Sequence, residues 1–251
     1  MNEYLSCVMN IGEQMLLCGA EVHRVEDSLQ RMCSAFGAVR TDIFIITSSM
    51  VATVMTPEGE SITQTRRING GGTDLERLHR LNDLSRRICH EKMTPAQIEE
   101  AYTAILETKN YPFSLECLAY AVIAGSFTLF FGGNWTEAAI SFFVGSLIRF
   151  VVLFVDRKVI NKMFGKCIAS FAASALAFVA VQAGLIPDID KIIIGNIMTL
   201  IPGIGLTNAL RDLFVGDSIT GLLRLADAAL NALAIAGGYL LFMCTLGGMT
   251  L

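Results

Sequence analysis

The chain has few charged residues, few aromatic residues and none of the common catalytic or nucleotide-binding motifs. Charged residues make up 17% and aromatic residues 8% of the 251 residues, with a single tryptophan. The patterns GxSxG, HExxH and GxGxxG and the Walker loop are all missing. A net charge of −4 without a basic run gives no electrostatic basis for binding nucleic acid. These absences argue against a nucleic-acid-binding protein and against the common hydrolase and nucleotide-dependent enzyme classes.

Metal-binding and disulfide patterns are missing as well. The seven cysteines are scattered without a CxxC pair, and His79 and His90 have no ligand-like spacing. We therefore expect free thiols in a reducing compartment, with no metal and no cofactor. The N-terminus has no basic region ahead of an apolar run, so it does not look like a secretory signal peptide. The N-terminal part is expected to stay in the cytoplasm.

Charge and hydrophobicity are distributed unevenly along the chain. Residues 1–115 carry 15 acidic and 11 basic side chains, whereas residues 116–251 carry eight of each. The whole chain is 53% hydrophobic, with a mean hydropathy of +0.54. We interpret it as an α+β cytosolic domain over residues 1–112, followed by an all-α membrane bundle of about five transmembrane helices over residues 113–251.

The first part alternates between helical and strand-like periodicity. Apolar residues recur first at helical spacing, and β-branched residues then take over on both sides of a turn expected at Pro57–Gly59. Thr73 with Glu76, and Thr94 with Gln97, have the spacing of capping boxes at the starts of later helices. The expected elements are helices over 2–17, 20–36, 74–91 and 95–107, and two or three antiparallel strands over 40–66.

A run of charged residues near the start of the second expected helix has two interpretations. Glu21, His23, Arg24, Glu26 and Asp27 lie close together in the sequence. One interpretation is a catalytic His/Glu pair. The other, which we prefer, is the solvated face of an amphipathic helix, because such a helix needs a polar side opposite its apolar stripe.

The second part contains apolar stretches long enough to cross a bilayer, which takes about 20 mostly apolar residues. The short loop at 156–166 has four basic residues and one acidic residue, and loops rich in Lys and Arg lie on the cytoplasmic side. We therefore expect a multi-pass protein of the cytoplasmic (inner) membrane, with its N-terminal domain in the cytoplasm and its C-terminus outside. The candidate spans are 115–132, 137–155, 167–186, 191–210 and 219–246.

The fourth candidate span contains a proline and two glycines near its middle. At a rise of about 1.5 Å per residue, Pro202 and Gly203 lie roughly 16 Å into the bilayer. Proline removes a backbone donor and glycine permits a break, and secondary transporters bind anionic groups at the positive end of such a half-helix. A kink that serves packing alone is the alternative interpretation. The residues that we assign to substrate binding are Thr199, Pro202, Gly203, Gly205, Thr207 and Asn208.

Charged residues follow the expected break. Arg224 and Asp227 lie within the fifth candidate span, three residues apart, so they share a helix face and can pair. Charges inside a span are costly and usually face the bundle interior or a water-filled pathway. The charges between the two spans either belong to the same pathway or cap helix ends at the interface. Arg149 is also deep, but snorkelling to the inner interface is the simpler interpretation. The residues that we assign to ion coupling are Arg211, Asp212, Asp217, Arg224 and Asp227.

Several segments together resemble the threonine/serine exporter family. These are GAEVHRVEDSLQRMCSAFGA, TDLERLHRLNDLSRRI, FGGNWTEAAISFFVGSLI and IIIGNIMTLIPGIGLTNALRDLFVGDSITGLLRLADAALNALAIAGG, with the late motif P-G-x-x-x-T-N-A-x-R-D-L-x-x-G-D running from Pro202 to Asp217. The resemblance implies proton-driven export of threonine, serine or related small carboxylates, dicarboxylates included. It also implies that the chain is the larger half of a split exporter whose partner is a second small five-span membrane protein. A homo-oligomer is the alternative.

Two other classes of function stay open on the sequence alone. A membrane-anchored, hydrolase-like enzyme would use the cytosolic domain, but no nucleophile–base or metal pattern supports it. A sensory or scaffold subunit would use the bundle only as an anchor, which does not require Pro202, Asn208, Arg224 and Asp227 inside the bilayer. We therefore expect a transporter subunit rather than an enzyme, embedded in lipid and acting on a small amino acid or carboxylate.

Overall fold

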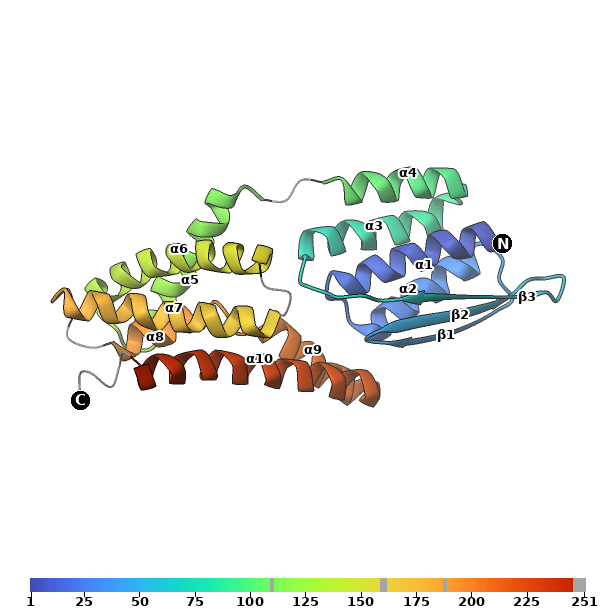
Figure 1. Ribbon diagram of the computed structural model, residues 1–251. Helices are drawn as coiled ribbons and strands as arrows, with labels where there is room; N and C mark the ends of the chain where they lie inside the picture. Colours follow the sequence, from blue (N-terminus) through green and yellow to red (C-terminus); the bar gives the residue numbers. More distant parts are fainter. Residues whose placement is uncertain (109–110, 159–161, 187–188, 246–251) are drawn as a thin grey trace. The chain divides into compact units, whose positions relative to one another are not determined.

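The computed structural model describes the chain apart from residues 109–110, 159–161, 187–188 and 246–251 and the side chains of residues 156–158 and 162 (Figure 1). The fold is mostly helical, with one small sheet. The chain divides into two compact units. The first comprises Met1–Lys109 and Ile204–Ala226, and the second comprises Asn110–Gly203 and Asp227–Leu251. A single boundary at residue 112 stays a prediction, and a late segment of the chain is grouped with the N-terminal unit.

The first unit has two layers of helices on one face of a three-stranded antiparallel sheet of order β1-β2-β3 (Figure 1). Helices α1 and α2 pack on the strands, and α3 and α4 pack on those helices. Part of α9 and the start of α10 complete the unit. The elements are α1 (Asn2–Leu17), α2 (Val22–Ala35), β1 (Arg40–Ile46), β2 (Ser49–Met55), β3 (Ser61–Arg67), α3 (Leu75–Glu91), α4 (Pro95–Leu106), α9 (Gly203–Val215) and α10 (Ser218–Thr245).

The core of the first unit lies between the sheet and the helices. Met50, Ala52 and Val54 of β2 are buried at alternate positions, as expected where side chains alternate between the two faces of a strand. Gly12 of α1 sits where a Cβ atom would lie 2.9 Å from Leu29 Cδ2 and 3.0 Å from Met50 Cε. A glycine at this position therefore lets α1 approach both α2 and the sheet.

The helix starts in this unit show one correct and one wrong prediction. The capping box at Thr94 is confirmed, because the Gln97 N–H donates to Thr94 Oγ1 at 3.4 Å and the Thr94 N–H donates to Gln97 Oε1 at 2.9 Å. The capping box at Thr73 is wrong. Helix α3 is capped instead by Asp74, whose carboxylate accepts a hydrogen bond of 2.9 Å from the Arg77 N–H. Aspartate is among the best N-cap residues, so it can take the role one position later.

The second unit is a helical bundle of membrane-spanning character. Within the part of the chain that the structure describes, four helices are long and apolar enough to cross a membrane, namely Phe113–Phe130, Trp135–Val155, Met163–Gln182 and Ser218–Thr245. The span expected over 191–210 is not one of them, because it is divided between α8 and α9. A count of five spans therefore stays a prediction. The elements are α5 (Phe113–Phe130), α6 (Trp135–Lys158), α7 (Lys162–Gln182), α8 (Asp190–Ile197) and the later part of α10.

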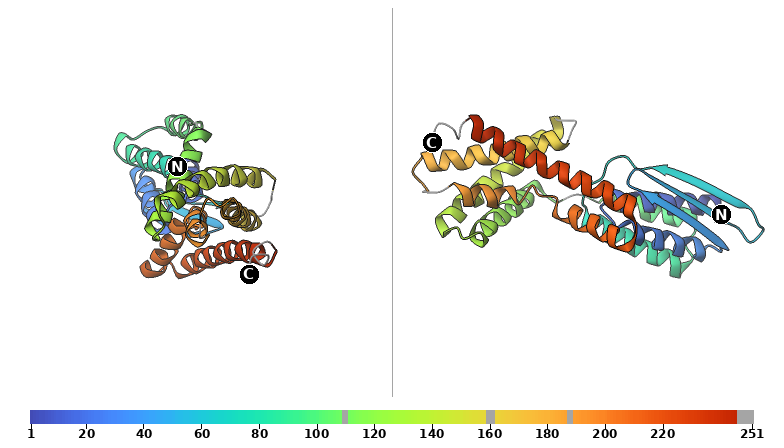
Figure 2. Two further views of the ribbon diagram at one scale, coloured as in Figure 1. Left: turned by 90° about the vertical axis from the view of Figure 1, so that its left-hand side faces the viewer. Right: turned by 90° about the horizontal axis from the view of Figure 1, so that it is seen from below.

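Small residues allow the first two of these helices to pack closely. Helices α5 and α6 lie side by side (Figure 2). A Cβ atom at Gly145 of α6 would lie 2.6 Å from Ala124 Cβ and 2.8 Å from the Tyr120 carbonyl oxygen of α5. Close backbone approach through glycine and alanine is typical of membrane helices, where packing rather than the hydrophobic effect holds helices together.

Candidate functional site

The predicted interruption near Pro202 is present. Helix α8 ends at Ile197, and α9 begins at Gly203 directly after the proline. The intervening residues form turns in which the Thr199 N–H and hydroxyl both donate to the Asn196 carbonyl oxygen, at 3.2 and 2.7 Å. Proline has no N–H to lose at a helix start, so this position suits it.

The start of α9 is open. Gly203, Gly205 and Thr207 are exposed, and a Cβ atom added at Gly203 would meet no other atom within 4 Å. The N-terminal end of a helix carries a partial positive charge and favours anions. The first turn of α9 is therefore accessible and has the polarity that a carboxylate would need.

The connection between α1 and α2, which we call the elbow (Gly19–Glu21), depends on a glycine. Gly19 has φ +90°, in the left-handed region, and a Cβ atom there would lie 2.9 Å from the Gly72 carbonyl oxygen. The Gly19 and Ala20 N–H groups close the end of α1 by donating to carbonyl oxygens of its last turn, each at 3.0 Å. The elbow then turns into α2, for which Glu21 is the N-cap residue.

The later part of the motif binds this elbow. Asn208 Nδ2 donates to the Gly19 carbonyl oxygen at 3.1 Å, and Arg211 Nη1 lies 2.8 Å from Glu21 Oε1. Arg224 Nη2 donates to the Ala20 carbonyl oxygen at 2.9 Å. Three side chains from α9 and α10 thus hold three consecutive residues near the N-terminus, all within the first unit.

A buried carboxylate completes this arrangement. Asp212 is 2% exposed, and its Oδ2 lies 2.9 Å from Arg224 Nη1. Burial raises the pKa of Asp212, and the charges of Asp217 and Glu21 add to this, whereas the Arg224 guanidinium opposes it. Arg224 is therefore held between a carboxylate of α9 and a carbonyl of the elbow. We call Asn208, Arg211, Asp212 and Arg224 the clamp.

The clamp changes two interpretations made from the sequence. Arg224 was expected to pair with Asp227, but its guanidinium contacts Asp212, and Asp227 is exposed. Glu21 was assigned to a solvated helix face, but its side chain is only 16% exposed and pairs with Arg211. Nothing in the local sequence separates Glu21 from its charged neighbours, because its partner is 190 residues away.

Asp217 acts through its charge on both Asp212 of the clamp and Glu26 of α2. Its backbone N–H donates to the Asp212 carbonyl oxygen at 2.9 Å, which links the end of α9 to the start of α10. Its buried Oδ2 has no hydrogen-bond partner among the described residues. Burial raises the pKa of Glu26 and the Asp217 charge raises it further, whereas the Ile45 backbone and His23 oppose the shift.

Three charged groups of the bundle, Glu116, Glu137 and Arg149, have local partners. Arg149 of α6 donates through Nε to Glu116 Oε2 at 2.9 Å, and its guanidinium lies 5.7 Å from the ring centres of Phe113 and Tyr120. The Arg149 side chain is only 16% exposed. It therefore pairs with Glu116 inside the bundle and does not extend to the interface as snorkelling would require. Glu137 is 2% exposed and caps its own helix.

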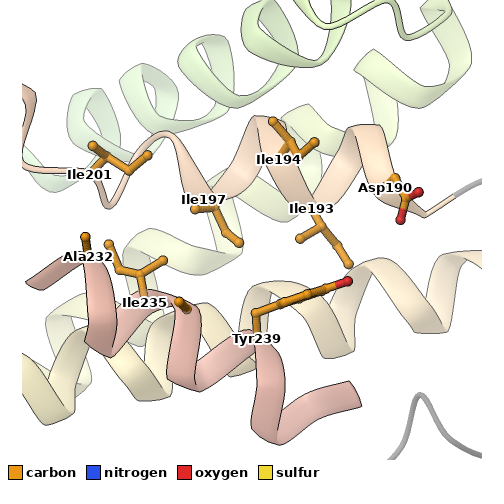
Figure 3. A pocket seen from close by; sticks show the side chains of 9 residues that line it. Asp190, Ile193, Ile194, Ile197, Ile201, Ala232, Ile235 and Tyr239 are labelled. Carbon is orange, nitrogen blue, oxygen red and sulfur yellow. The ribbon is translucent and has the colours of Figure 1, made fainter. Parts of the chain in front are cut away.

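An apolar groove lies within the second unit between α8 and α10 (Figure 3). Its volume is about 520 Å³, and side chains of Ile193, Ile197 and Ile201 face those of Ile235 and Tyr239. Asp190 lies at one end of it. This lining suits an apolar chain, and it does not suit the paired charges of a free amino acid.

Four helices of spanning length, in a chain that also folds an α+β unit, define a multi-pass membrane protein. The family described as "Putative threonine/serine exporter" (ThrE) matches residues 6–246. The chain therefore belongs to the threonine/serine exporter family, which is a family of transporters and not of enzymes.

Two groups of relatives differ in length. A "Probable succinate transporter subunit YjjP" of Klebsiella aerogenes is 24% identical over 93% of this chain and 90% of its own length, and the Escherichia coli protein of that name is also 24% identical, over 93% and 91%. A "Threonine/serine exporter" of Corynebacterium glutamicum is 24% identical over 93% of this chain but only 49% of its own length. No solved structure matches the chain.

Proposed function

We propose that this chain is a subunit of a secondary transporter that exports threonine, serine or a related small carboxylate, dicarboxylates included, across the cytoplasmic membrane. The proton gradient drives this export. The N-terminal domain lies in the cytoplasm, and the C-terminus lies outside. The observation that carries the proposal is the exposed, glycine-rich start of α9 directly after a proline-interrupted helix, within a chain of the exporter family.

In this proposal the start of α9 receives the carboxylate of the substrate. Gly203 leaves room for it, Gly205 is exposed, and the positive end of α9 favours its charge. Thr199 and Thr207, which flank the glycines in the sequence, supply hydroxyl groups that can hydrogen-bond to the substrate. Pro202 keeps the preceding backbone out of a helix.

The clamp serves to position this site. Asn208 and Arg211 lie on the same helix as the glycines. Asn208 donates a hydrogen bond to the elbow, and Arg211 forms an ion pair with it. The clamp therefore links any movement of α9 to the α+β domain. Asp217 and Asp227 are the candidates for carrying a proton, and Asp227→Asn should weaken the dependence of efflux on the pH gradient.

A second subunit completes the transporter. The Corynebacterium relative is about twice as long as the stretch that it shares with this chain, whereas the similar proteins of matching length are named subunits. The word subunit in these two names favours a separate second membrane protein over a homo-oligomer.

The test is efflux from proteoliposomes loaded with radiolabelled threonine, serine or succinate, prepared with this chain alone and together with a candidate five-span partner. We expect gradient-dependent efflux of at least one of the three when both subunits are present, and loss of that efflux when a protonophore collapses the gradient. Failure of every substrate and every partner would contradict the proposal and would favour a sensory or scaffold subunit.

A further inference from the structure

Three hydroxyl and carboxamide groups meet inside the second unit. Thr128 of α5, Ser141 of α6 and Asn196 of α8 are each 0% exposed. Thr128 Oγ1 lies 2.6 Å from Ser141 Oγ, and Asn196 Nδ2 lies 2.8 Å from the same oxygen. We call these three residues the polar cluster. It joins three helices of the bundle at one point.

Further oxygen atoms surround the polar cluster. Thr128 Oγ1 also lies 3.0 Å from the Ala124 carbonyl oxygen and 3.4 Å from that of Lys191, although a hydroxyl group has only one proton to donate. The Ile192 carbonyl oxygen lies 2.8 Å from Asn196 Nδ2. Six oxygen atoms therefore gather close together. Three are side-chain oxygens of the cluster, and three are backbone carbonyl oxygens of α5 and α8.

One of these oxygens lacks a partner. Asn196 Oδ1 is buried and accepts no hydrogen bond from the described residues. A buried acceptor left unsatisfied costs free energy and calls for an explanation such as an ordered water or an ion. The oxygen and nitrogen of a carboxamide are assigned from the surrounding hydrogen bonds. Turning the Asn196 carboxamide over would give up the two hydrogen bonds that Nδ2 donates and would direct Oδ1 at Ser141 Oγ and the Ile192 carbonyl oxygen instead. A bound cation would stabilise that second arrangement.

The position in the fold suits a cation as well. Asn196 lies in the last turn of α8, directly before the interruption. The C-terminal end of a helix carries a partial negative charge, and interrupted helices in membranes use such ends and nearby carbonyl groups to hold monovalent ions. Gly195 lets α8 approach this closely, because a Cβ atom there would lie 2.8 Å from the Ala124 carbonyl oxygen.

We propose that the polar cluster binds a sodium ion. Hard cations take oxygen ligands, and oxygens that share one cation at about 2.4 Å lie within about 5 Å of one another. The six oxygens are neutral, which matches a single positive charge better than a double one. The bound ion ties α8 to α5 and α6 beside the interruption. This site does not depend on which substrate the transporter exports.

The test is thermal unfolding of the purified full chain in detergent, in NaCl against choline chloride and KCl at equal ionic strength. A ligand that binds only the folded state raises Tm in a saturable way. We expect sodium to raise Tm by on the order of 5 °C at saturation relative to choline. If sodium gave no specific rise in Tm, the proposal would be overturned. The polar cluster would then be a set of hydrogen bonds between helices, completed by an ordered water.

Matched variants locate the effect. Thr128→Val and Ser141→Ala each remove one oxygen with little change of shape, and both should abolish the sodium-specific rise. Thr128→Ser keeps the hydroxyl and should retain it. Ser174→Ala is the control, because Ser174 is equally buried but donates to the Ser170 carbonyl oxygen within α7. A rise that persists in both Thr128→Val and Ser141→Ala would also overturn the proposal, and this result is independent of any efflux measurement.

Discussion

At the scale of single residues, Arg224 is the residue of the candidate site that pairs with a buried charge. Its guanidinium joins a carboxylate that is 2% exposed to a backbone carbonyl oxygen of the elbow. A buried ion pair contributes little net stability while it is intact, but removing one partner leaves an uncompensated charge in a poorly solvated place. Asp212 is the residue that would be left with this charge.

Arg224→Met should therefore destabilise the protein strongly. We expect a loss of about 3 kcal/mol in the free energy of unfolding, measured by denaturant or thermal unfolding in detergent. Arg31→Met is the control, because Arg31 and Asp27 form an exposed pair one helical turn apart, and such surface pairs contribute little to stability. Equal effects of the two substitutions would show that the clamp is not formed.

Glu26 should make stability depend on pH. Its pKa is raised in the folded state by burial and by Asp217, so the folded protein binds its proton more tightly than the unfolded chain does. Stability should therefore fall as pH rises from the ordinary carboxyl pKa through the raised one. Glu26→Gln should flatten this part of the Tm–pH curve, and Glu100→Gln, at an exposed position of α4, should not. An unchanged slope in Glu26→Gln would contradict the assignment.

Residue types and spacing identified the motif but not the contacts that it makes. The spacing of Arg224 and Asp227 indicated a pair on one face of a helix, yet the preferred partner is Asp212, which approaches through the turn between α9 and α10. Glu21 became a functional candidate only when the fold brought it to Arg211. Partners that are 190 residues apart, as Glu21 and Arg211 are, leave no local signal in one sequence.

At the scale of secondary-structure elements, most short-range signals were reliable, although the capping box at Thr73 was wrong. The expected helix over 2–17 coincides with α1, and the turn at Pro57–Gly59 separates β2 from β3. Local periodicity and turn chemistry determine such features. The grouping of Ile204–Ala226 with the first unit was not predictable, because hydropathy alone assigns that segment to the bundle.

The elbow provides a test at this scale. Gly19→Ala places a Cβ atom at φ +90° and 2.9 Å from the Gly72 carbonyl oxygen, so it should cost more than the roughly 1–2 kcal/mol of left-handed backbone strain alone. Gly37→Ala is the matched control, since Gly37 has φ +87° and no atom within 4 Å of an added Cβ. Thermal unfolding should rank Gly19→Ala as clearly less stable, and the reverse order would contradict the described elbow.

At the scale of the whole molecule, orientation in the membrane is the first expectation to test. Basic residues between α6 and α7 predict that this connection faces the cytoplasm. Cysteines introduced at Lys162 and after Leu251, in a background without native cysteines, should label from opposite sides, with Lys162 on the cytoplasmic side. Labelling of both positions from the same side would rule out the expected topology.

The most direct test of the central claim is the effect of filling the start of α9 on transport. Gly203→Val adds a branched side chain where the substrate carboxylate is proposed to bind, whereas Gly237→Val adds the same side chain at an equally unobstructed glycine of α10. We expect both variants to insert into the membrane in normal amounts. In loaded proteoliposomes, Gly203→Val should lose gradient-driven efflux and Gly237→Val should keep it. Equal efflux from the two variants would contradict the assignment of the interrupted helix to substrate binding.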